Sequence, residues 1–381
     1  MTATEIKVYA SLPRVAALGG DLNLDANNWH WLLCLTLPLV TLDALQFSPR
    51  PYKWIRYAIG IVVGAEGDLS SSSDLINVVD YNAGLPTESV ALYYHTSDDE
   101  KRRMFPVDPN IGRTNITSSV ATSRRAQFHS AAAMRDGNRC VLTGIDEDVC
   151  DAVHLLAHSK GDTYISTYTQ RRSRDPARAD IVQDIDSVRN GLLLNNYSHR
   201  GLGRHIAFLS TPNFAMDTTD VDPTAPAGEK RYTAHLFEPS KPFFSGGTSE
   251  PPSGVSLRIS HTPDWPPAIL FEAVYASTVL HHFGAQLLKD EVAATWKYIF
   301  YLDGVMSQAQ AEHKEVVGRQ ARYDAYAGPD NFDILLALPY ILMPPDELQA
   351  MMREAKEKAA GAEQRDVQEK VNNWNKQIIA S

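Results

Sequence analysis

Apolar residues fall in short runs through the first third of the chain, and Pro-, Gly- and Ser-rich clusters separate these runs. Residues 57–63 (YAIGIVV) and 89–94 (SVALYY) have the composition of β-strands. The apolar run at residues 31–42 is interrupted by Pro38, so it predicts a buried strand or a short helix. We therefore expect a β-containing N-terminal region over residues 1–117.

Helical spacing of apolar residues is found on both sides of a polar stretch. Residues 123–134 are compatible with a helix, and apolar residues recur at intervals of three and four in 269–282 and 291–301. Between them, residues 216–255 are rich in Pro, Gly and polar side chains. This composition predicts a loop or linker, with a strand at 232–237.

The end of the chain predicts one long helix that completes a helical C-terminal region over residues 256–381. Pro344 and Pro345 open it, and apolar residues spaced by three and four continue from Leu348 to Ile378. Such a helix either packs on the protein's own core or binds a partner or a second copy of the chain.

Residues 118–215 carry the candidate chemistry. His154 is the only polar residue of the run AVHLL, as expected of a short strand that presents one polar side chain. Asn190 precedes a glycine and the apolar run LLL, and His199 follows shortly after. Taken from the residues alone, His154 could be a hydrogen-bonded core histidine, Asn190 a turn residue and His199 a surface histidine.

This segment resembles the HNH endonucleases, the ββα-metal or His-Me finger group. The CxxTG opening at Cys140, the lone histidine after Cys150 and the NGLLL…HR block carry the resemblance, which is closest to an HNH variety frequent in fungal proteins. It implies an α/β (α+β) protein with a central ββα-metal finger, flanked by the N-terminal and C-terminal regions described above.

The resemblance also implies roles for three side chains. His154 would be the general base that deprotonates the attacking water, a role that suits an imidazole because its pKa lies near neutral pH. Asn190 would orient this base through hydrogen bonds. His199 would be a ligand of one divalent metal ion, whether Mg, Mn, Zn or Ni.

One position departs from the family pattern. Many members carry an Asp or His immediately before the base as a second metal ligand, whereas this chain has Val153 there. Asp151 and His158 are close in the sequence but out of register with that position, so neither is favoured as the missing ligand. We expect His158 to be a loop residue or a phosphate contact. We expect weak metal binding without DNA and an apoprotein that folds by itself. Cys140 and Cys150 lack the spacing of a structural zinc site and should pack in the core of the finger.

Basic residues gather locally in a chain of net charge −10. Between Ala121 and Ser210 we count twelve basic and ten acidic residues, with an Arg cluster in the insert between the two halves of the motif. Arg pairs well with phosphate, so we expect weak and sequence-tolerant contacts with DNA, although an ordinary solvated loop would have the same composition. The expected contacts are Arg171, Arg172, Arg174, Arg200 and Arg204.

Features of the whole chain indicate the compartment in which the protein acts. Its three cysteines cannot form a disulfide framework, its first residues have no signal-peptide pattern, and its apolar run at 31–42 is shorter than the ~20 residues that span a membrane. We expect a soluble intracellular protein, in the cytoplasm or the nucleus, that does not bind membranes. The predicted function is a divalent-metal-dependent DNA endonuclease or nickase. The alternatives are a non-catalytic module that binds nucleic acid or protein, and an interaction protein that acts through its C-terminal helix.

Overall fold

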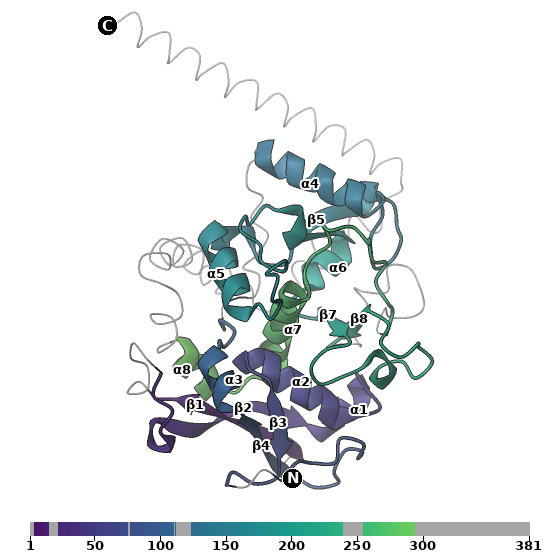
Figure 1. Ribbon diagram of the computed structural model, residues 1–381. Helices are drawn as coiled ribbons and strands as arrows, with labels where there is room; N and C mark the ends of the chain where they lie inside the picture. The colour runs from purple at the N-terminus through teal and green to yellow at the C-terminus, as the bar shows by residue number, and fades with distance from the viewer. Residues whose placement is uncertain are drawn as a thin grey trace, which may run out of the picture. The chain divides into compact units, whose positions relative to one another are not determined.

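A computed structural model describes residues 4–14, 22–74, 77–109, 111, 123–238 and 254–293, all of which lie in the compact unit Met1–His313. The long helix expected after Pro344 and most of the helix expected at 291–301 lie outside the described residues. The α+β class is confirmed, since helices and mixed sheets alternate along the chain (Figure 1). The boundaries at 117, 215 and 255 stay predictions.

The N-terminal region is built on a four-stranded sheet of order β2-β1-β4-β3. Its strands are β1 (Glu5–Pro13), β2 (Trp29–Pro38), β3 (Gly67–Ser70) and β4 (Val90–Thr96). β1 pairs antiparallel with β2 and parallel with β4, and β3 pairs antiparallel with β4. Alternate residues of β1 are buried, as in a sheet that covers a core on one face. The strand predicted at 89–94 is confirmed by β4.

The strand predicted at 57–63 is wrong, because these residues form the second half of α2 (Pro51–Val63). A continuous apolar run does not distinguish a buried strand from a buried helix. Here Pro51 favours the first helical turn, and Gly64 ends the helix in the left-handed conformation at φ 74°. The run at 31–42 contains both structures that were considered, because β2 is followed at once by α1 (Leu39–Leu45).

The middle of the chain has the expected strand–strand–helix order. After α4 (Ser123–Arg135), β5 (Cys150–His154) pairs antiparallel with β6 (Gly191–Asn195), and α6 (Asn196–Gly201) follows directly. The insert between the strands contains α5 (Asp162–Arg172). Short 3-10 helices flank the strands at Glu147–Val149, His158–Lys160 and Val188–Asn190.

A second hairpin and a buried helix complete the fold. β7 (Ile206–Thr211) pairs antiparallel with β8 (Arg231–Leu236), which confirms the strand predicted at 232–237. α7 (Ala268–Phe283) confirms the helix predicted at 269–282 and packs against β7 and α2. Most of its residues are buried, so it is an internal helix rather than a surface one. The short helices α3 (Asp98–Arg103) and α8 (Gln286–Glu291) lie against the N-terminal sheet region (Figure 1).

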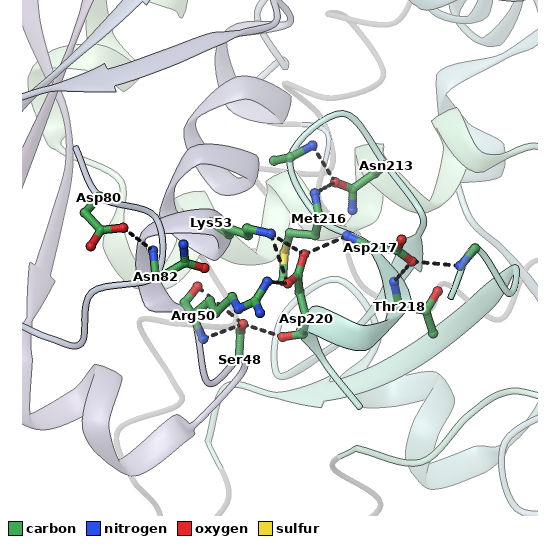
Figure 2. A network of polar contacts seen from close by, with 12 residues as sticks. Ser48, Arg50, Lys53, Asp80, Asn82, Asn213, Met216, Asp217, Thr218 and Asp220 are labelled. Atoms are coloured by element: carbon green, nitrogen blue, oxygen red, sulfur yellow. Dashed lines mark hydrogen bonds and ion pairs between the residues drawn. The ribbon is translucent and has the colours of Figure 1, made fainter. Parts of the chain in front are cut away.

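The segment between β7 and β8 is tied to the N-terminal region by Asp220, whose side chain is 1% exposed. Arg50 Nη1 lies 2.6 Å from its carboxylate and Lys53 Nζ lies 2.8 Å from it, while Ser48 donates to its backbone carbonyl (Figure 2). Asp217 and Asp220 also cap the 3-10 helix Thr218–Asp220 reciprocally. This part of the predicted linker is therefore held in place by a network of charged groups.

In the portion of the chain that the structure covers, no helix combines the length and the apolar character needed to cross a membrane.

Candidate functional site

His154 ends β5 and lies under an aromatic ring. It is 9% exposed, and its imidazole stacks on Phe128 of α4 with ring centroids 4.0 Å apart and planes 9° from parallel. The residue opposite His154 in the register of β5 and β6 is Gly191. A Cβ at Gly191 would come within 2.3 Å of the Phe128 ring. The glycine is thus what allows Phe128 to approach β6 closely and to cover the imidazole.

A buried carboxylate joins His154 to a second histidine. Asp186 Oδ1 lies 2.9 Å from Nε2 of His154 and 2.7 Å from Nδ1 of His158. A carboxylate oxygen accepts, so both ring nitrogens donate, and His154 carries its lone pair on Nδ1. Burial alone would raise the pKa of Asp186, but the hydrogen bonds and charges of His158 and His154 bring this pKa below its ordinary value. Asp186 is therefore a carboxylate near neutral pH.

Asn190 fastens the segment that follows His154. It is fully buried, its side-chain oxygen accepts from Leu156 N at 2.9 Å, and its amide donates to the carbonyls of Leu156 and Ile185 at 2.9 and 2.8 Å. Its own carbonyl accepts from Leu155 N at 2.7 Å. These contacts fix the residues after His154 and the residue before Asp186. They therefore hold the backbone of His154 and the backbone of Asp186 at the distance that their hydrogen bond requires.

His199 is positioned by α6, whose N-cap Asn195 accepts from Ser198 N. Its Nδ1 lies 2.7 Å from Asp151 Oδ2, with side-chain exposures of 15% and 49% respectively. The hydrogen bond from His199 has the largest effect on the pKa of Asp151, and it lowers this pKa. Burial raises the pKa, but the hydrogen bond and the charges of His129 and Arg200 together exceed that effect, so the pKa lies below its ordinary value. Nδ1 donates to the carboxylate, so the lone pair of His199 is on Nε2.

Asp151 reaches His199 from the face of β5 that also carries Val153, because side chains two residues apart in a strand share a face. Val153 is 1% exposed and belongs to the hydrophobic core. Asp151 therefore supplies a carboxylate near the position where Val153 supplies none. Asp151 is out of register with the family's usual ligand position, but the period of two along a strand places it on this face.

The structure brings the three predicted site residues onto one ββα unit but into two groups. His154 belongs with Asp186 and His158, and His199 belongs with Asp151. Across the described residues, two sets of three or more side chains place possible metal-ligand atoms within 4.8 Å of one another. One set is His154, His158 and Asp186. The other, which lies outside the predicted site, is His205, Glu238 and His282.

The arginines expected to contact DNA fall into two classes. Arg171, Arg200 and Arg204 are exposed. Arg172 and Arg174 instead make contacts within the protein, Arg172 by donating to the carbonyl of Ile61 at 2.8 Å and Arg174 by the ion pairs described next.

Arg174 pairs with Glu100 through both terminal nitrogens, at 2.8 and 2.6 Å, and with Glu66 at 3.1 Å. These contacts attach the insert to the N-terminal region. The positive charge of Arg174 is matched by two carboxylates, so it adds little to the attraction of phosphate from this surface.

Cys140 and Cys150 are free thiols buried in the core, as predicted. The sulfur of Cys140 accepts from the backbone N–H groups of Thr143 and Asn195. Burial raises the pKa of Cys150 to about 11. The Cys150 thiol is therefore protonated near neutral pH, and both cysteines serve packing.

Comparison with known proteins agrees with this geometry. Residues 140–208 match the family described as HNH endonuclease, a segment that includes β5, β6, α6 and the start of β7. HNH nucleases act on nucleic acids and usually bind a divalent metal ion. The curated proteins and the solved structures contain no match to the chain.

Proposed function

We propose that this protein, whose residues 140–208 form an HNH-family segment, is a divalent-metal-dependent DNA endonuclease or nickase. One observation carries the proposal. The histidine at the family's base position has its Nε2 held by a buried carboxylate, and this leaves Nδ1 as its basic nitrogen.

The proton transfer is assigned to His154. Its Nδ1 takes a proton from the water that attacks the phosphorus, and the imidazolium so formed is stabilised by the negative charge of Asp186, 2.9 Å from Nε2. General-base catalysis of this kind contributes roughly 10²–10⁴ to the rate. Asn190 acts by holding the backbone on both sides of the pair.

The metal ion is assigned to His199 together with Asp151. Nε2 of His199, which carries the lone pair, would be the ligand atom, because Nδ1 donates to Asp151 at 2.7 Å and this hydrogen bond fixes the tautomer. Phosphate and water would complete the coordination of Mg, Mn, Zn or Ni. When bound, the ion would act as a Lewis acid toward the phosphate charge and the leaving oxygen. Val153 is buried and apolar, so it contributes nothing to this donor set.

DNA binding is assigned to the exposed Arg171, Arg200 and Arg204. Arg200 follows His199 directly, so a phosphate near His199 would lie within reach of its guanidinium. The excess of positive charge in this segment is small, and we therefore propose weak binding that depends on salt.

The alternative is a non-catalytic module derived from an HNH nuclease, which binds nucleic acid or protein. The covering of His154 by Phe128 favours it, because a base that is 9% exposed admits water only at its edge. In this case Asp186 and Asn190 would be retained for stability alone.

A nicking assay separates the two candidates. Supercoiled plasmid is incubated with the purified full chain and Mg, Mn, Zn or Ni in turn, with a chelator as control. The endonuclease proposal requires nicking that depends on the metal, is lost in His154→Ala and is retained in His261→Ala, a change at an exposed histidine outside the site. Binding of DNA without nicking under any metal would favour the module instead.

A further inference from the structure

The second set of possible metal ligands lies where the β7–β8 hairpin meets the end of α7. His205 immediately precedes β7, Glu238 comes two residues after β8, and His282 lies in the last turn of α7. The pairing of Ile206 with Leu236 places the first two at the open end of the hairpin. His205 Nδ1 and Glu238 Oε1 are 3.3 Å apart, and all three side chains offer ligand atoms within 4.8 Å of one another.

Hydrogen bonding and stacking orient His282. Its Nε2 lies 2.7 Å from the carbonyl of Arg204, an acceptor, so Nε2 donates and the lone pair is on Nδ1. Its ring also stacks on Phe237, with centroids 5.4 Å apart and planes 23° from parallel. Metal-binding histidines commonly have this arrangement, in which the second ring nitrogen donates to a carbonyl or carboxylate and fixes the tautomer.

The backbone holds the other two ligands to the same place. Phe237 N donates to the carbonyl of His205 at 2.8 Å, which fixes the residue before Glu238 against His205. The side chains of His205 and Glu238 are 14% and 30% exposed, so this is a partly buried group that an ion can still reach.

We propose that His205, Glu238 and His282 form a zinc site that is separate from the HNH site. Two imidazoles and one carboxylate are a known three-ligand set for Zn²⁺, with water in the fourth position. Tetrahedral coordination at ~2.1 Å separates ligand atoms by roughly 3.4 Å. The 3.3 Å between His205 Nδ1 and Glu238 Oε1 fits this value, and the ligand atom of His282 lies within 4.8 Å of both.

The ion would link the hairpin to α7. Since β7 packs on α7 and immediately follows the ββα unit, bound zinc would fasten the strand after α6 to the internal helix. This role does not depend on cleavage of DNA, and it goes beyond the function proposed above.

The test uses the full chain, freed of metal with a chelator and then titrated with Co²⁺ and with Zn²⁺. The measured quantities are the tetrahedral absorption bands of Co²⁺, the stoichiometry and the dissociation constant. To remove the metal proposed for the HNH site, the titration is repeated in His199→Ala. We expect one remaining equivalent with tetrahedral bands in this variant.

Variants at the proposed ligands give the decisive comparison. His282→Ala should raise the dissociation constant of this remaining ion by on the order of 100-fold or more, since loss of a residue that only supports a ligand costs 10–100-fold in affinity. His281→Ala is the matched control on the same helix, because His281 is exposed and outside the ligand set. Glu238→Gln keeps the shape of a partly exposed side chain, so it provides a second loss of affinity with little risk to folding.

The proposal is overturned if His199→Ala binds no Co²⁺ in tetrahedral form, or if His281→Ala weakens binding as much as His282→Ala. Retention of full affinity in both His282→Ala and Glu238→Gln would also overturn it. These results are independent of nicking, so failure of the endonuclease proposal would leave the zinc proposal standing, and the reverse also holds.

Discussion

Asp151 and His199 face each other across the ββα unit with 2.7 Å between Oδ2 and Nδ1, although 48 positions separate them in the chain. The pair shows how a strand can provide a carboxylate two residues before the usual position. It also favours tighter metal binding than Val153 alone would suggest, because His199 has a carboxylate partner. That carboxylate either binds the ion itself or holds the imidazole in place.

Replacement of this carboxylate should weaken metal binding. We expect Asp151→Asn to raise the dissociation constant for Mn²⁺ by about 10–100-fold, because the negative charge near the ion and the fixed tautomer of His199 are both lost. Calorimetric titration measures the change. Asp148→Asn, at an exposed acidic residue nearby in the sequence, is the control and should bind as the unmodified protein does. Equal binding by both variants would remove Asp151 from the metal site.

Loss of the His154–Asp186 contact should reduce the rate of nicking without loss of DNA binding. We expect His154→Ala to lower kcat by roughly 10²–10⁴ and Asp186→Asn to lower it less, since an amide still holds the ring but does not stabilise the imidazolium. Single-turnover nicking gives the rate, and a filter-binding assay gives the affinity for DNA. A loss of DNA affinity equal to the loss of rate would indicate a structural role for Asp186.

A methyl group at Gly191 should disturb the packing over His154. The added Cβ would meet the Phe128 ring at 2.3 Å, so we expect Gly191→Ala to lower the free energy of unfolding by about 1–3 kcal/mol. Urea denaturation measures this change. Gly84→Ala is the matched control, because a Cβ there meets nothing within 4 Å. Introducing Phe128→Leu together with Gly191→Ala should restore part of the loss, and an additive double variant would contradict the proposed clash.

Asp220 should make stability depend on pH in the acid range. Burial alone would raise its pKa, but hydrogen bonds from Lys53 and from Asp217 N, with the charges of Lys53 and Arg50, lower it below the ordinary value. A lowered pKa means that the unfolded chain takes up the proton first. The stabilisation is therefore complete above the unfolded pKa of ~4 and is lost as the pH falls through the folded value.

The test compares urea unfolding at several pH values between neutral and acid. Asp220→Asn should cost about 2 kcal/mol at neutral pH and should reduce the loss of stability on acidification. Asp99→Asn is the control, since the Asp99 side chain is 97% exposed. A variant at Asp220 with the same acid profile as the unmodified protein would show that another carboxyl causes the loss.

The sequence could predict those features that local pattern determines. The helix at α7 and the strand at β8 follow from the local pattern of apolar residues. The ββα order and the choice of His154, Asn190 and His199 as site residues come from the resemblance to the HNH family, and the roles of these three residues stay predictions. α2 was predicted as a strand in part, because a buried helix and a buried strand are both continuous apolar runs.

The residues that contact His154, Asn190 and His199 could not be predicted from the local sequence pattern. Asp186 lies in the insert, where no periodic element fixes its position, and its contact with His154 depends on how Asn190 closes the loop. The cluster of His205, Glu238 and His282 arises only when the hairpin and α7 meet. Asp151 is the exception, because the period of two along β5 already places it on the face of Val153.

The two hydrogen bonds of Tyr275 bear on how this nuclease-like segment could be moved between proteins. Its hydroxyl lies 2.7 Å from Nε1 of Trp54 on α2 and 2.6 Å from Nδ1 of His235 on β8, so one side chain of α7 connects the N-terminal region with the hairpin after the finger. A fragment ending at residue 215 would lose that connection and would expose Phe208, which is 1% exposed in the full chain. The finger is therefore not expected to fold independently of the rest of the chain. A chimaeric protein that contains the finger would also have to include β8 and α7.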